Sequence, residues 1–98
     1  GWSVFVAQNA SAKSKLLAEC LFDEASSNGW KVRTPTPTQK YWVQSLAMCR
    51  DTICPAVLIE NFFMDNQPDC EFLCKEENKD AIAQATANGI INYSEQCK

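Results

Sequence analysis

The chain contains no histidine among its 98 residues. This absence excludes mechanisms that need an imidazole group from this chain alone, whether a Ser-His-Asp triad, a Cys-His pair or a histidine-ligated zinc ion. The sequence also lacks a glycine-rich phosphate loop, a Gly-x-Ser-x-Gly elbow and a His-Glu-x-x-His helix. None of these common catalytic motifs can therefore carry its function.

The chain also has little positive charge and no long apolar run. Its 9 Lys and Arg residues stand against 12 Asp and Glu residues, and no basic cluster suits a nucleic-acid backbone. The longest apolar run, residues 53–59 with Pro55 included, is far shorter than the roughly 20 residues of a membrane-spanning helix. We therefore predict no nucleic-acid partner and no membrane span, and the length allows one small domain or part of a larger one.

Cysteine, in contrast, is abundant. Six cysteines in a short chain permit a disulfide framework, with fifteen possible pairings, or a four-thiolate zinc site. A third interpretation, buried reduced thiols, fits better because Cys20, Cys49 and Cys54 fall at apolar positions. The zinc alternative would use Cys49, Cys54, Cys70 and Cys74. The sixth cysteine is Cys97.

Hydrophobic patterns predict an α/β fold. Residues 4–7 and 30–33 suggest short strands, and residues 11–28 an amphipathic helix capped by Asn9 or Ser11 and ended at Asn28-Gly29. Residues 34–38 contain two prolines and predict a loop, while residues 41–50 fit either a helical turn or an extended segment.

The second half continues this alternation. The apolar run 55–59 predicts a strand buried on both faces of a parallel sheet. A short helix through Leu73 is capped by Asn66 or Asp69, and a long helix runs from residue 76 or 78 to about Tyr93. Its expected apolar side holds Ile82, Ala85, Gly89, Ile90 and Tyr93. We expect a mostly parallel open sheet of about three strands with two long flanking helices.

Glu60 is the main candidate for chemistry because it directly follows the apolar strand. In open parallel sheets, ligands bind beyond the carboxyl ends of the strands. A carboxylate at that position is either a general base or a carboxylate beside a metal, or it is a structural group that caps a nearby helix or pairs with Arg33 or Arg50.

Three further residues are candidates for substrate binding. Asn61 and Asn66 flank an aromatic cluster and can hydrogen-bond a substrate, although satisfying a turn is the simpler role for both. Trp42, next to the proline loop, can contact a sugar or peptide.

The segment from Pro55 to Asn66, Pro-Ala-Val-Leu-Ile-Glu-Asn-Phe-Phe-Met-Asp-Asn, resembles the C-terminal signature of the type-3 family of zinc-dependent N-acetylmuramoyl-L-alanine amidases. The likeness continues through residues 69–73 and 89–93 and extends back to residues 1–5 and 31–33. It covers nearly the whole chain.

This resemblance implies that Glu60 is the catalytic glutamate, acting beside a zinc-bound water on the amide between N-acetylmuramic acid and L-alanine of peptidoglycan. The family's zinc ligands, two histidines and a glutamate, lie upstream of these residues, so we expect no zinc on this chain alone. The family acts on bacterial cell walls, which implies an extracellular or periplasmic site of action.

The resemblance also implies that residues 1–98 form the C-terminal half of a six-stranded domain. Half a sheet exposes an unpaired edge, so we expect association with the missing N-terminal half or self-association. Two alternatives remain open. The chain can be a non-catalytic amidase-like binding or regulatory piece, or it can be a secreted six-cysteine protein similar to elicitins, which are all-helical, bind lipids and contain three disulfides.

Overall fold

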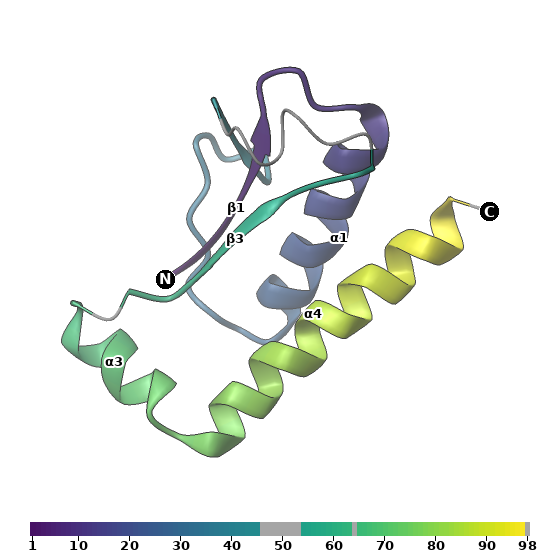
Figure 1. Ribbon diagram of the computed structural model, residues 1–98. Coiled ribbons are helices and arrows are strands. Elements are labelled where there is room, and N and C mark those ends of the chain that lie inside the picture. The colour runs from purple at the N-terminus through teal and green to yellow at the C-terminus, as the bar shows by residue number, and fades with distance from the viewer. Residues whose placement is uncertain (46–53, 64, 98) are drawn as a thin grey trace.

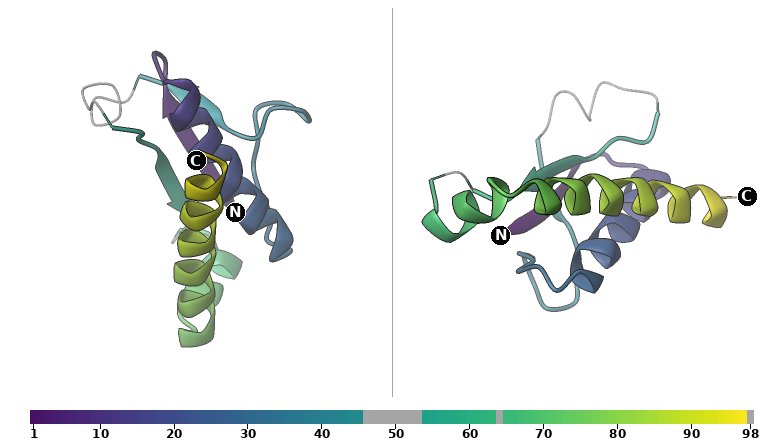
Figure 2. Two further views of the ribbon diagram at one scale, coloured as in Figure 1. Left: turned by 90° about the vertical axis from the view of Figure 1, so that its right-hand side faces the viewer. Right: turned by 90° about the horizontal axis from the view of Figure 1, so that it is seen from below.

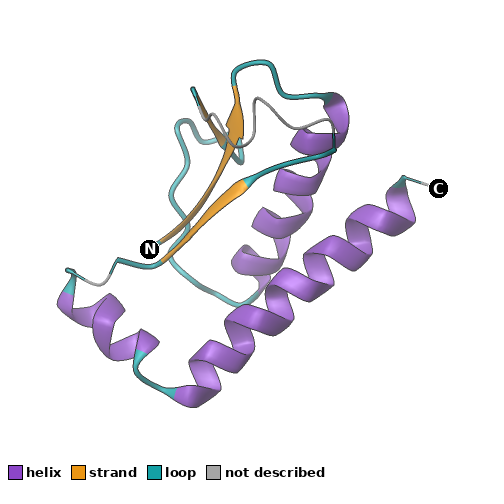
Figure 3. Ribbon diagram, in the orientation of Figure 1, coloured by secondary structure: helices purple, strands orange, loops and turns teal. Residues whose placement is uncertain are grey.

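The computed structural model describes residues 1–45, 54–63 and 65–97 (Figure 1). It confirms the α/β class, with three strands and two long helices among these residues (Figure 3). In chain order, the elements are β1 (Trp2–Ala7), α1 (Ala12–Ser27), β2 (Trp42–Gln44), β3 (Leu58–Asn61), α3 (Gln67–Leu73) and α4 (Glu76–Gln96).

The sheet has the order β2-β1-β3 and is mixed. Strand β2 is parallel to β1, with Trp42 opposite Phe5, whereas β3 is antiparallel to β1, with Glu60 opposite Ser3. The predicted strand 30–33 is reduced to an isolated parallel bridge between Val32 and Trp2.

The prediction for residues 55–59 was wrong in direction and in burial. Strand β3 begins only at Leu58, lies at an edge of the described sheet, and leaves Leu58 42% exposed. A short apolar run is compatible with a central or an edge strand, and the partner that decides its direction is distant in sequence.

The core lies between β1 and α1. Because strand side chains alternate between faces, Trp2, Val4 and Val6 point to α1, where they form a cluster with buried residues of that helix. Those helix residues are Ala18, Leu21 and Ala25. Both long helices lie on this side of the strands (Figure 2). The opposite face, which carries Ser3 and Phe5, is covered by neither long helix and is called the open face below.

Local signals set the ends of α1 as predicted. The Ser11 side chain accepts a hydrogen bond from the Ser14 backbone N–H at 3.2 Å, and Gly29, with a φ of 76°, follows the helix. The predicted loop at residues 34–38 is also confirmed, and the ambiguous segment 41–50 is extended at β2.

Helix α4 packs against α1 through small residues. A Cβ atom at Gly89 would lie 2.7 Å from Cδ2 of Leu21, so a larger residue at position 89 would force Leu21 to shift. Ala85 and Gly89 are buried as predicted, but Ile90 is 50% exposed because it is rotated about 100° away from the contact line. None of the helices in the described ranges is both long enough and apolar enough to cross a membrane.

The cysteines are only partly buried. Cys20 is buried as predicted, but Cys54 is exposed, and Cys49 lies outside the described residues. Four of the six thiols are free, namely Cys20, Cys70, Cys74 and Cys97, so a framework of three disulfides is excluded. Together with the β-sheet, this rules out the elicitin-like alternative.

Candidate functional site

Glu60 lies within β3, and its side chain belongs to the open face. Trp2 and Val4 point into the core, so Ser3 between them points to the open face. Glu60 is directly opposite Ser3 in the sheet and therefore points to the same face. The Glu60 side chain is half-buried and makes no hydrogen bond or ion pair with any residue in ranges 1–45, 54–63 and 65–97. Glu60 lies near the start of β1, because β3 runs antiparallel to β1. It is therefore not at an edge where the carboxyl ends of parallel strands meet, as the sequence predicted.

A small cavity of about 130 Å³ lies on the same face. Its lining residues are Ser3, Phe5, Arg33, Trp42 and Gln44. The Trp42 ring stacks on Phe5 with a centroid distance of 6.3 Å, and its Nε1–H donates to the Arg33 carbonyl oxygen at 3.1 Å. The structure therefore places Trp42 on the face that carries Glu60, as part of a cavity wall.

Arg33 does not pair with Glu60. Its guanidinium lies 5.2 Å from the centroid of the Phe63 ring, and it forms no ion pair within the described part of the chain. The other proposed partner, Arg50, lies outside the described residues. The ion pair first considered for Glu60 is therefore not formed with Arg33 or with any other described residue.

Asn61 and Asn66 are not brought to Glu60. Asn61 follows Glu60 on the strand and points to the opposite face, where its Oδ1 is buried and accepts no hydrogen bond within the described ranges. Asn66 is the N-cap of α3, and its Oδ1 accepts from the Asp69 backbone N–H at 3.1 Å. The capping role considered for Asn66 is confirmed.

Asp69 joins three elements next to this face. Its Oδ2 accepts from the Gly1 nitrogen, and also from the Phe63 backbone N–H at 2.9 Å. Burial acts to raise the pKa of this carboxyl, but the two hydrogen bonds outweigh it and hold the pKa below its ordinary value. A second cavity, of about 370 Å³, adjoins it and is lined by Gly1, Lys31, Arg33, Phe63, Asn66, Pro68 and Asp69.

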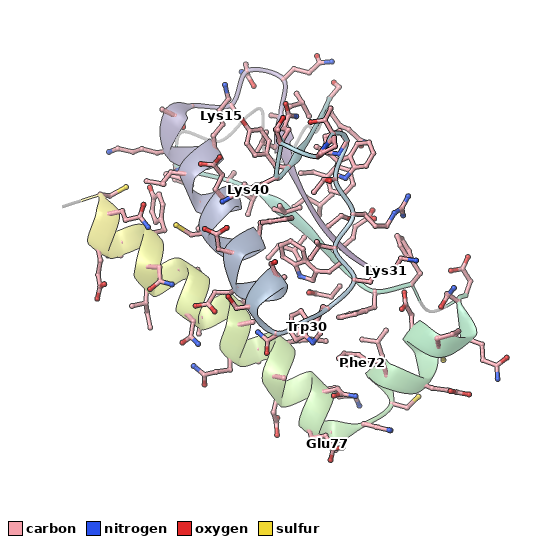
Figure 4. All side chains as sticks on the ribbon, turned by 180° about the vertical axis from the view of Figure 1, so that it is seen from behind. Lys15, Trp30, Lys31, Lys40, Phe72 and Glu77 are labelled. Atoms are coloured by element: carbon pink, nitrogen blue, oxygen red, sulfur yellow. The ribbon has the colours of Figure 1, made fainter. Side chains whose placement is uncertain are left out.

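Three aromatic rings pack where the chain leaves β3. The Phe62 ring centroid lies 4.6 Å from that of Phe72 and 5.5 Å from that of Trp30. Figure 4 shows Phe72 on the inner side of α3, toward Trp30, at a centroid distance of 6.2 Å. These contacts fix the turn that follows Glu60.

The described residues do not fit a zinc site by themselves. They contain no cluster of three or more Cys, Asp or Glu side chains that could hold a metal ion, and the sequence has no histidine. The cysteine zinc site considered above finds no such cluster in the part of the chain that is described, and Cys49 lies outside it. We derive no step through a metal ion from this chain.

Sequence reasoning named Arg33 as a candidate partner of Glu60 and Asp69 as a candidate helix cap, but it missed Ser3 and did not place Arg33 and Asp69 at these cavities. One local signal was available for Ser3, since it is the only polar residue in the buried strand Trp2–Ala7. Arg33 and Asp69 gave no such signal, because their places depend on a β-bridge and on a helix cap formed with distant segments.

The comparisons identify the family of this α/β domain. The profile of the N-acetylmuramoyl-L-alanine amidase family matches residues 1–92, which is nearly the whole chain. The chain therefore belongs to this amidase family. A search of curated proteins gave no match.

Solved structures support the same fold. The chain is similar to the CwlD amidase from Clostridioides difficile in complex with the GerS lipoprotein, with a TM-score of 0.80, 27% identity, and coverage of 97% of this chain and 46% of that chain. It is also similar in fold to the N-acetylmuramyl-L-alanine amidase Ami1 from Mycobacterium smegmatis, with a TM-score of 0.84, 21% identity, and coverage of 95% and 46%. The chain thus spans about half the length of these amidases.

Proposed function

We propose that this chain is part of a peptidoglycan hydrolase that cleaves the amide bond between N-acetylmuramic acid and L-alanine, with Glu60 as the general base. The observation that carries the proposal is the family match over residues 1–92 together with the half-buried Glu60 carboxylate on the open face. A carboxylate with no partner among the described residues has its oxygens available to accept a proton.

In this proposal, the Glu60 carboxylate accepts a proton from a water molecule as the water oxygen attacks the carbonyl carbon of the lactyl group. Glu60 then passes the proton to the nitrogen of L-alanine as the carbon–nitrogen bond breaks. The products are the free lactyl carboxyl group and the free amine of the peptide. General-base catalysis of this kind contributes about 10²–10⁴-fold in rate.

Zinc belongs to the proposal only as the cofactor that the family resemblance implies. When bound in an amidase of this kind, zinc would supply Lewis-acid polarisation of the carbonyl group. The family resemblance implies that its ligands lie upstream of these residues, and the described residues contain no cluster of three or more side chains that could hold a metal ion.

Trp42 and the open face support a role in substrate contact. The half-buried Trp42 ring forms one wall of the 130 Å³ cavity, where it can pack against a sugar or the peptide. Asn61 and Asn66 remain predictions as substrate-binding residues. Peptidoglycan is the proposed partner, and pairing of the sheet edges with further chain or with a second copy remains a prediction, as does action at an extracellular or periplasmic site.

The substitution Glu60→Gln in the full-length protein tests the role of this carboxylate. It keeps the shape of the side chain but removes the basic oxygen, so we expect kcat on muramoyl-peptide substrate to fall at least about 10²-fold, with substrate binding and metal content unchanged.

Glu77→Gln is a matched control, because Glu77 is an exposed glutamate in the first turn of α4, distant from the open face (Figure 4). Its rate should equal that of the unmodified protein. An unchanged rate in Glu60→Gln would refute the role of Glu60, and a complete absence of hydrolysis by the unmodified, metal-loaded protein would favour the non-catalytic binding or regulatory alternative.

A further inference from the structure

Arg33 lies in one row with Ser3 and Glu60 across the sheet. Arg33 follows Val32, the parallel partner of Trp2, and its backbone N–H donates to the Trp2 carbonyl oxygen at 2.8 Å. It therefore lies beside Ser3, whose antiparallel partner on the other side is Glu60. Two strand spacings separate the Arg33 and Glu60 backbones by about 10 Å. Because Ser3 between them is small, no bulky side chain of β1 separates the two.

The Arg33 side chain crosses β1 toward the strand of Glu60. A Cβ atom placed on Gly1 would lie 3.2 Å from both Cγ and Cδ of Arg33, so the stem of Arg33 passes over Gly1. Its guanidinium then reaches the ring of Phe63, the second residue beyond the end of β3. The positive charge of Arg33 is thereby held on the side of β1 where Glu60 lies.

This charge has no ionic partner among the residues in the described ranges. Arg33 lines both the 130 Å³ cavity on the open face and the 370 Å³ cavity beside it. Lys31, two residues earlier on the same side of the chain, also lines the larger cavity. The one carboxylate there, Asp69, already accepts hydrogen bonds from the Gly1 nitrogen and the Phe63 amide. The two cavities that Arg33 lines thus have a net positive lining that suits an anionic group.

We propose that Arg33 binds a carboxylate of the peptide part of the substrate while Glu60 acts on the amide bond, so that Arg33 determines specificity for acidic peptides. This inference rests on the proposed function. The planar guanidinium can donate two parallel hydrogen bonds to a carboxylate, and a neutral amide at the same place would offer only one acceptor oxygen. Lys31 adds positive charge to the same cavity.

The test compares two muramoyl-L-alanyl peptides that differ at one group. In one, the residue after L-alanine has a free carboxylate, and in the other this group is the primary amide. Calorimetric titration into the full-length protein carrying Glu60→Gln measures binding without turnover. We expect the carboxylate compound to bind about tenfold more tightly than the amide, as a charge-assisted hydrogen-bonded pair at a partly exposed site would give.

Adding Arg33→Gln should abolish this preference by weakening binding of the carboxylate compound alone, and Arg33→Lys should retain part of it. Lys13→Gln, an exposed cation on α1, is the matched control and should leave the preference intact. Equal binding of the two compounds, or an equal loss for both on Arg33→Gln, would overturn the role of Arg33. Hydrolysis by the protein with Glu60 intact is scored separately, so a failure of the amidase proposal is distinguished from a failure of this one.

Discussion

The rings of Phe62 and Phe72 lie 4.6 Å apart, and Phe62 has a left-handed backbone conformation with a φ of 68°. A bulky residue rarely adopts this conformation, which costs of order 1–3 kcal/mol unless packing fixes it. Here the packing of Phe62 against Phe72 and Trp30 supplies that constraint. The aromatic cluster therefore sets the direction in which the chain leaves the strand of Glu60.

Two substitutions at Phe62 separate its packing from its backbone strain. Phe62→Ala removes the ring but keeps a Cβ atom at positive φ, so we expect it to lower the free energy of unfolding by about 2–3 kcal/mol. Phe62→Gly loses the same ring but relieves the strain, and should be more stable than Phe62→Ala by about 1 kcal/mol. Urea denaturation measures both. A glycine variant no more stable than the alanine variant would contradict the strained conformation.

Asn66 allows its capping role to be distinguished from its predicted role in substrate binding. Asn66→Ala removes the acceptor for the Asp69 N–H and should destabilise the protein by about 1 kcal/mol, whereas Asn66→Ser keeps a capping oxygen and should be close to the unmodified protein. Thermal unfolding together with muramoyl-peptide binding checks this. If Asn66→Ser is fully stable but binds substrate more weakly, the Asn66 amide contacts the substrate as well.

Cys20 gives a prediction for alkaline pH. Burial raises the pKa of its thiol above the ordinary value of 9.0, and the nearby carboxylates of Asp23 and Glu19 raise it further. Since the folded state holds this proton more tightly than the unfolded state, the stability that Cys20 contributes is present below pH 9.0 and is lost as the pH rises above that value.

Alkylation measured by peptide mass spectrometry checks this prediction. Iodoacetamide should modify buried Cys20 more slowly than exposed Cys97, and the rate at Cys20 should continue to rise with pH above 9.0. In urea the two rates should become similar. Equal rates in the folded protein would show that Cys20 is accessible.

Features encoded by neighbouring residues were predictable from the sequence. The Ser11 cap and Asn28-Gly29 define the ends of α1, and the run of strand-forming residues at 4–7 indicated β1, because caps and local propensity act over a few residues of chain. Glu60 was found as a candidate in the same way, as a carboxylate beside an apolar run. The family, too, could be inferred from the Pro55 to Asn66 signature, and the match over residues 1–92 confirms it.

Strand pairing decided which residues lie around Glu60. The antiparallel register of β3 puts Glu60 on the open face opposite Ser3 and sends Asn61 to the other face, although the two residues are adjacent in sequence. The same pairing, with the bridge at Val32, brings Arg33 into the row of Glu60 from 27 positions away in the chain. Pairing joins distant segments whose direction and register no local pattern encodes, so the sequence by itself determined the elements, the family and the candidate base, and only the tertiary structure decided which side chains surround that base.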